Sequence, residues 1–176
     1  MRRIDTRALL VCAAVLATGI AGAQYTKPVD ERSYNLGIIG GFAEVVRRGV
    51  KTLALSEVMT PEQMDDIMPD ALVVAQRNGV ELYRETDLIV TDLFPADVAK
   101  GKHVLLIYTG DTLGRYLELK GLRAELVAAE RYESAAREAI ARRFGRLLSY
   151  PEDVIDELLA ATRAAQTNST NDSQEP

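Results

Sequence analysis

Apolar residues recur at two different spacings along this chain, which predicts a fold that contains both helices and strands. Over residues 35–49 they fall at helical spacing, whereas over 50–56 they alternate with smaller residues as in a strand. The stretch TPEQ at 60–63 begins a second helix, because threonine can cap it, proline suits its first position and glutamine completes a capping box. Pro69 lies inside that helical pattern and predicts a break or kink, with a second segment over 70–78.

The middle of the chain carries three short runs with the composition of strands, at 80–85, 87–94 and 103–108. The first two are either tightly joined strands or one bent strand. The run HVLLIY at 103–108 is the most apolar of them and is the candidate for the central strand. From Thr112 onward the spacing becomes helical, with a break near 131–133. These patterns predict an α/β or α+β fold: a small mixed sheet of about four strands, covered by helices, with a helix-rich C-terminal half.

Residues 1–23 are predicted to be a secretory signal peptide. Basic residues come first, an uncharged apolar run follows over 8–20, and Ala21-Gly22-Ala23 supplies the small residues of a cleavage site. The apolar run has 13 residues, whereas a helix needs roughly 20 to span a bilayer. We therefore expect a periplasmic or secreted protein with no membrane insertion after cleavage, a single globular domain over 24–165 and a disordered polar tail over 166–176.

Removal of the signal peptide changes the composition of the protein. Its single cysteine, Cys12, would be lost, so neither a disulfide nor a thiolate nucleophile is expected. Three arginines and one aspartate are removed from the totals of 21 basic and 26 acidic residues. The remaining 18 basic and 25 acidic residues give a formal net charge of −7. Such a balance argues against nucleic acid as a partner, because its binding depends on neutralising phosphates with Lys and Arg. No cofactor is identified from the sequence.

The turn between the run HVLLIY and the helix that follows it is a candidate ligand site. Thr109, Gly110, Asp111 and Thr112 would offer hydroxyls and close backbone approach at a helix N-terminus, where free N–H groups favour an anion. The Asp111 carboxylate would instead suit a cation, an amine or a hydroxyl. The same residues have a structural explanation, because Asp111 or Thr112 can cap the helix and Gly110 permits a tight turn.

Three predicted strands end in a hydroxyl and a carboxylate: Ser56-Glu57, Thr91-Asp92 and the pair Thr109 and Asp111. If the strands ran parallel, these groups would form a polar rim able to bind a divalent metal or a polyol. Only residues 95–102 join two of the strands, whereas a parallel crossover needs roughly a dozen residues. An antiparallel pairing would separate the polar ends.

Two hypotheses for the function follow. The first is an exported, soluble accessory protein that binds a partner protein or a small polar ligand without catalysis. The second is a small hydrolase or isomerase that uses Asp92 and Asp111 as acid and base, which a divalent metal could assist. The second requires that both carboxylates share one pocket.

A cluster of arginines in the segment 134–148 has two interpretations. Arg137, Arg142, Arg143 and Arg146 could form a site for an anion or an acidic partner. Glu133 and Glu138, however, stand four residues before Arg137 and Arg142, which is the favourable orientation for ion pairs along a helix. The sequence favours a solvated, charge-paired helix face.

Overall fold

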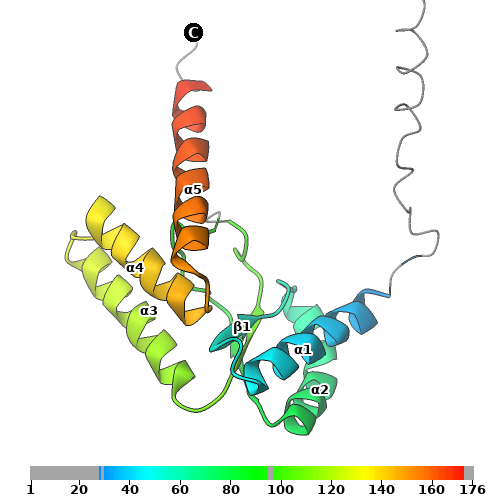
Figure 1. The fold of residues 1–176 in the computed structure, drawn as a ribbon. Helices are drawn as coiled ribbons and strands as arrows, with labels where there is room; N and C mark the ends of the chain where they lie inside the picture. Colours follow the sequence, from blue (N-terminus) through cyan, green and yellow to red (C-terminus); the bar gives the residue numbers. More distant parts are fainter. Residues whose placement is uncertain (1–27, 29, 95–96, 173–176) are drawn as a thin grey trace, which may run out of the picture. The chain divides into compact units, whose positions relative to one another are not determined.

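The computed structural model describes residue 28, residues 30–94 and residues 97–172, with the side chains of the last helix described as far as residue 164. The predicted signal peptide lies outside these residues. Within them the fold is α+β, with five helices and a three-stranded antiparallel sheet. The helix-rich C-terminal half is confirmed (Figure 1).

The elements follow one another in a simple order. The N-terminal half contains α1 (Glu31–Arg47), β1 (Leu53–Leu55), α2 (Pro61–Asn78), β2 (Glu81–Glu85) and β3 (Val104–Tyr108). The C-terminal half contains α3 (Thr112–Ala128), α4 (Ser134–Leu147) and α5 (Glu152–Asp172). The last helix extends into the segment 166–176, for which the sequence predicts a disordered tail, and the disorder of that tail stays a prediction. No helix among the described residues is long and apolar enough to cross a membrane.

The strand β3 is central, as predicted, and the sheet order is β1-β3-β2. Both neighbours pair with β3 antiparallel, with Leu53 and Glu81 opposite Tyr108. The sheet is therefore antiparallel rather than mixed. Successive side chains of a strand point to opposite faces, and all five residues of β3 are buried, so each face of this sheet supports a hydrophobic core.

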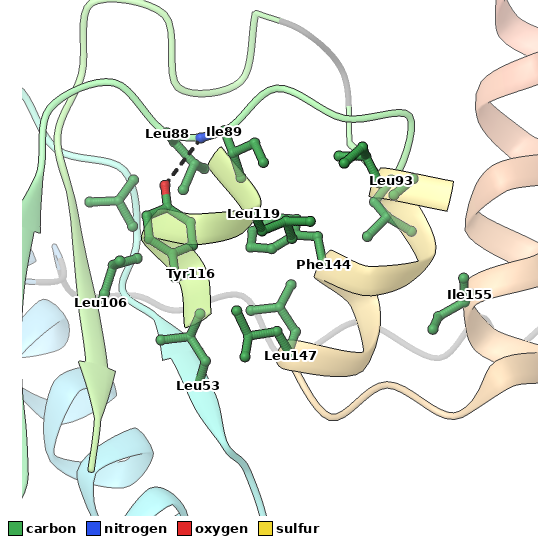
Figure 2. Close-up of a cluster of buried hydrophobic side chains, with 14 of the residues drawn as sticks. Leu53, Leu88, Ile89, Leu93, Leu106, Tyr116, Leu119, Phe144, Leu147 and Ile155 are labelled. Atoms are coloured by element: carbon green, nitrogen blue, oxygen red, sulfur yellow. Dashed lines mark hydrogen bonds between the residues drawn. The ribbon is translucent and has the colours of Figure 1, made fainter. Parts of the chain in front are cut away.

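One core lies between the sheet and the first two helices. It contains Leu105 and Ile107 of β3, together with residues of α1 and α2 such as Ile39 and Ile67. Val104, Leu106 and Tyr108 contribute instead to a second core, which includes residues of α3, α4, α5 and the connection between β2 and β3 (Figure 2). The alternation along β3 thus makes the sheet the middle layer of the domain.

The start of α2 forms as the sequence predicts. The Thr60 hydroxyl accepts a hydrogen bond from the Gln63 N–H at 3.2 Å, and the Gln63 side chain accepts one from the Thr60 N–H at 2.9 Å. Of the break or kink predicted at Pro69, the break is wrong, because α2 runs without interruption to Asn78, and the kink stays a prediction. Apolar residues on both sides of the proline are buried in the first core, namely Met64, Ile67, Ala71 and Ala75, and their packing maintains one helix.

The predicted strand over 87–94 is also wrong. Residues 88–91 have no regular secondary structure, although Leu88, Ile89 and Leu93 are buried in the second core. Their apolar side chains pack as those of a buried strand would, but the N–H of Ile89 bonds to the Tyr116 hydroxyl of α3 at 3.2 Å rather than to a neighbouring strand (Figure 2). The connection from β2 to β3 is therefore a loop that follows the core.

Candidate functional site

The turn at 109–112 is a compact link between β3 and α3. Gly110 has φ +62°, the left-handed conformation that glycine adopts without strain. The Thr112 hydroxyl is buried and donates to the Thr109 carbonyl at 2.9 Å. Asp111 occupies the N-cap position, but its exposed side chain makes no capping hydrogen bond. These contacts explain the shape of the turn, and its binding of a ligand stays a prediction.

Asp92 lies in a different environment, where it is bound by an arginine of α4. Arg137 donates through Nε to one Asp92 oxygen at 3.1 Å and through Nη2 to the other at 2.5 Å. This bidentate ion pair and its hydrogen bonds raise the pKa of Arg137. With both oxygens accepting hydrogen bonds from a guanidinium, the carboxylate serves to attach the loop after Thr91 to α4.

Asp92 and Asp111 do not share a pocket. The helices α3 and α4 pack antiparallel, with the Tyr116 and Phe144 rings 6.1 Å apart. Arg137, the partner of Asp92, lies two turns before Phe144, and Asp111 precedes Tyr116 on the opposite side of that contact. At 1.5 Å per residue, the positions of Arg137 and Asp111 are roughly 18 Å apart along the axis of the helical hairpin.

The polar rim predicted from the strand ends does not form. Ser56 follows β1 and lies beside the start of β3, where its hydroxyl accepts a hydrogen bond from the Leu105 N–H at 2.9 Å. Thr109 follows the other end of β3. Because β1 and β3 run antiparallel, these hydroxyls lie near opposite ends of β3. In the described part of the chain, no group of three or more His, Cys, Asp or Glu side chains is placed to hold a metal ion.

The arginines of α4 are largely occupied by acidic side chains. Arg142 pairs with Glu138 at 2.9 Å, as the sequence predicts, and with Asp156 of α5 at 2.6 Å. Arg146 pairs with Glu152 at 2.5 Å. The prediction for Arg137 was only half right: it is paired, but with Asp92 rather than with Glu133. These contacts support a charge-paired face between α4 and α5 rather than an anion site.

A cavity of about 180 Å³ lies within the connection between β2 and β3. Among the residues that the structure describes, eleven line it: Thr86, Asp87, Leu88, Ile89, Val90, Thr91, Phe94, Val98, Ala99, Lys100 and Gly101. Six of these are apolar: Leu88, Ile89, Val90, Phe94, Val98 and Ala99. Val90 and Val98 remain substantially exposed, at 39% and 44%. The cavity is thus a small, mostly apolar recess open to solvent.

A buried carboxylate, that of Glu85, helps to hold the segment 86–91 that lines one part of this recess. Glu85, at the end of β2, has a side chain only 3% exposed. It accepts hydrogen bonds from the Tyr116 hydroxyl at 2.8 Å, from Lys120 Nζ at 3.0 Å and from the Asp87 N–H at 2.8 Å. Burial of a charged group requires such compensation, and here three donors provide it.

The same group of side chains also holds the main chain of the loop. Tyr116 accepts a hydrogen bond from the Ile89 N–H (Figure 2). Lys120 donates one to the carbonyl oxygen of Asp87. Burial of its ring, with a contribution from the hydrogen bond to Glu85, raises the pKa of Tyr116 far above that of an ordinary tyrosine. Tyr116 therefore remains protonated and can donate a hydrogen bond. Side chains of α3 thus hold the main chain of the loop around Leu88.

Sequence reasoning did not identify this group. Tyr116 and Lys120 stand four residues apart, which places them on one face of α3, and Glu85 is an acidic residue at the end of a predicted strand. Nothing in the sequence joins that strand to that helix face, 31 positions further on. No protein-family model, curated protein or solved structure matches this chain.

Proposed function

We propose that this protein is an exported, non-catalytic accessory protein that binds a small ligand in the recess between β2 and β3. The observation that carries the proposal is the combination of a mostly apolar recess of about 180 Å³ with a buried group, here called the anchor, formed by Glu85, Tyr116 and Lys120, which holds its loop. Ligand sites are concave, mostly apolar and largely preformed, with a small number of placed polar groups. This recess has that character on a small scale.

The anchor favours binding because the loop is already ordered, so less conformational entropy is lost when a ligand binds. A loop without fixed main-chain contacts would have to be ordered on binding, at a cost to affinity. Here the main chain at Asp87 and Ile89 is held by side chains of α3 before any ligand arrives. Two threonines and two charged residues on the wall supply the polar groups that orient a ligand.

The contacts of the carboxylates favour binding over catalysis. A general base must be free to accept a proton in the site, whereas Asp92 is held by both arms of the Arg137 guanidinium. Asp111 is exposed and lies at the other end of the helical hairpin. A hydrolase or isomerase that depends on these two residues would need them in one pocket.

A thermal-shift screen of the purified protein against small aromatic and aliphatic compounds tests the proposal. A ligand present at a hundredfold its dissociation constant adds about 2.7 kcal/mol of stability. In a domain of this size, that should raise the melting temperature by roughly 5–10 °C. Binders found in this way should lose their shift in Ala99→Phe, which fills the recess.

Two further variants make the screen specific. Ala160→Phe introduces the same side chain at an exposed position of α5, away from the recess, and should keep the shift. Asp111→Ala alters the turn at 109–112 and should also keep it. Loss of the shift in Asp111→Ala, with retention in Ala99→Phe, would refute the recess as the site and favour the turn.

A further inference from the structure

Part of the recess is continuous with the second core. Leu88 and Ile89, two of its lining residues, are buried members of that core (Figure 2). Phe94 and Ala99 are partly buried and pack against the same core. We call these four residues the floor of the recess. None of them has a polar side-chain atom, so their side chains offer a ligand apolar contact and no hydrogen bond.

The charged residues of the recess lie at its exposed rim. Asp87 has a side chain that is 86% exposed, and Lys100 is exposed as well. The two carry opposite charges, so an ion that one of them attracts is repelled by the other. The rim therefore favours neither an anion nor a cation. What distinguishes one ligand from another is the apolar floor and the space above it.

The size of the recess limits the apolar part of a ligand. An apolar cavity of about 150 Å³ is large enough for benzene, and this recess measures about 180 Å³. It therefore accommodates one aromatic ring or a branched alkyl group of similar size. Because the recess is open to solvent, a longer chain enters only in part. The part that stays in water buries no apolar surface and adds nothing to the affinity.

Ala99 has the smallest side chain of the floor. A larger apolar side chain at this position would take space from the recess, whereas glycine would add space. The turn that carries Ala99 is held through the main chain, because the Lys102 N–H donates to the Ala99 carbonyl at 3.0 Å. A change of the Ala99 side chain leaves that contact in place.

We propose that the ligand is a small, uncharged and largely hydrocarbon molecule, and that Ala99 sets the upper limit of its size. The bound part is one aromatic ring or one branched alkyl group. A charged group that entered the recess would lose hydration and find no partner among the side chains of the floor. The inference rests on the proposed function, since it names the class of ligand and a specificity-determining residue for the same recess.

A series of alkylbenzenes from benzene to butylbenzene tests the size limit. Their dissociation constants are measured by NMR titration of the purified protein. Each methylene group that enters the recess should tighten binding about fourfold. The gain should stop once the recess is full, so the affinity should level off before butylbenzene. A gain that continues undiminished to butylbenzene would overturn the size limit.

Two substitutions at Ala99 should move the limit in opposite directions. Ala99→Val should make the affinity level off at a shorter alkyl chain, and Ala99→Gly should make it level off at a longer one. Ala160→Val makes the same change at an exposed position of α5, and the limit should stay where it is. If neither Ala99 variant moves the limit while melting curves show that both are folded, Ala99 does not determine the ligand size.

Benzoate and benzylamine test the preference for an uncharged ligand. Both contain the ring of toluene with a charged substituent, and both should bind more weakly than toluene. Tighter binding of either ion would overturn the uncharged class while the recess remains a ligand site. If none of the probes binds, toluene included, the proposed function falls, and this inference falls with it.

Discussion

The substitution Gly145→Ala tests the packing of α4 against α5 and against the loop of the recess. Gly145 is buried in α4. A Cβ atom at this position would lie 2.8 Å from both Cγ1 and Cδ1 of Ile155 and 3.4 Å from Cδ1 of Leu93. Ile155 is fully buried, so it cannot rotate into solvent to make room (Figure 2).

The expected magnitude follows from two opposing effects. An extra methyl group in a packed core costs about 1–3 kcal/mol, while alanine is favoured over glycine inside a helix by about 1 kcal/mol. Gly145→Ala should therefore lower the free energy of unfolding by about 1 kcal/mol. At Gly121, in the exposed part of α3, a Cβ atom would meet nothing within 4 Å beyond the backbone of its own helix. Gly121→Ala should therefore raise the free energy of unfolding by about 0.5–1 kcal/mol.

Urea denaturation and thermal melting of the two variants measure the difference. For a domain of this size, each kcal/mol shifts the melting temperature by roughly 2–4 °C. The two variants should therefore melt about 3–8 °C apart, with Gly145→Ala below the wild type and Gly121→Ala above it. Equal stabilisation by both substitutions would refute the close packing of Gly145 on Ile155.

Three other predictions concern individual polar contacts. Tyr116→Phe removes the hydroxyl shared by Glu85 and Ile89, so we expect a loss of about 1–3 kcal/mol in urea denaturation and faster exchange of the Ile89 amide; unchanged values would contradict the anchor. Because burial raises the pKa of Tyr116, the unfolded chain releases this proton at a lower pH, and stability should fall as the pH rises above about 10. That fall should be smaller in Tyr116→Phe. The hydrogen bond from Arg146 lowers the pKa of Glu152, and in an NMR titration Arg146→Gln should return Glu152 to the ordinary glutamate range.

Much of the fold could be predicted because its signals are local or periodic. The capping box at Thr60 and Gln63 depends on residues three positions apart, and it forms as expected. The run at 103–108 is continuous in apolar residues, which is typical of a strand covered on both faces, and β3 is buried throughout. Such features need no information from distant parts of the chain.

The loop after β2 could not be predicted from its own sequence. The apolar residues over 87–94 are compatible with a β-strand. They are equally compatible with an irregular segment that packs on a core. In the structure the hydroxyl of Tyr116, 27 positions away, accepts a hydrogen bond from the Ile89 N–H. That N–H is therefore not available to pair with a neighbouring strand. The recess depends on this long-range contact, so no local pattern in the sequence predicts it.

The partner of Arg137 was missed for a similar reason. The spacing of Glu133 and Arg137 predicts an ion pair only if both residues lie within the helix. Glu133 is the N-cap residue with φ −92° and ψ −179°, so its side chain does not lie one turn below Arg137. Asp92, 45 positions earlier in the chain, takes its place.

The central claim, that the recess binds a small ligand, is tested most directly by chemical-shift mapping with benzyl alcohol. This neutral probe tests the recess without any assumption about the charge of its natural ligand. Saturable shifts should concentrate at the amides of residues 86–91 and 97–101, and they should disappear in Ala99→Phe. Saturable shifts at residues 109–112 instead, or shifts that never saturate, would contradict the account.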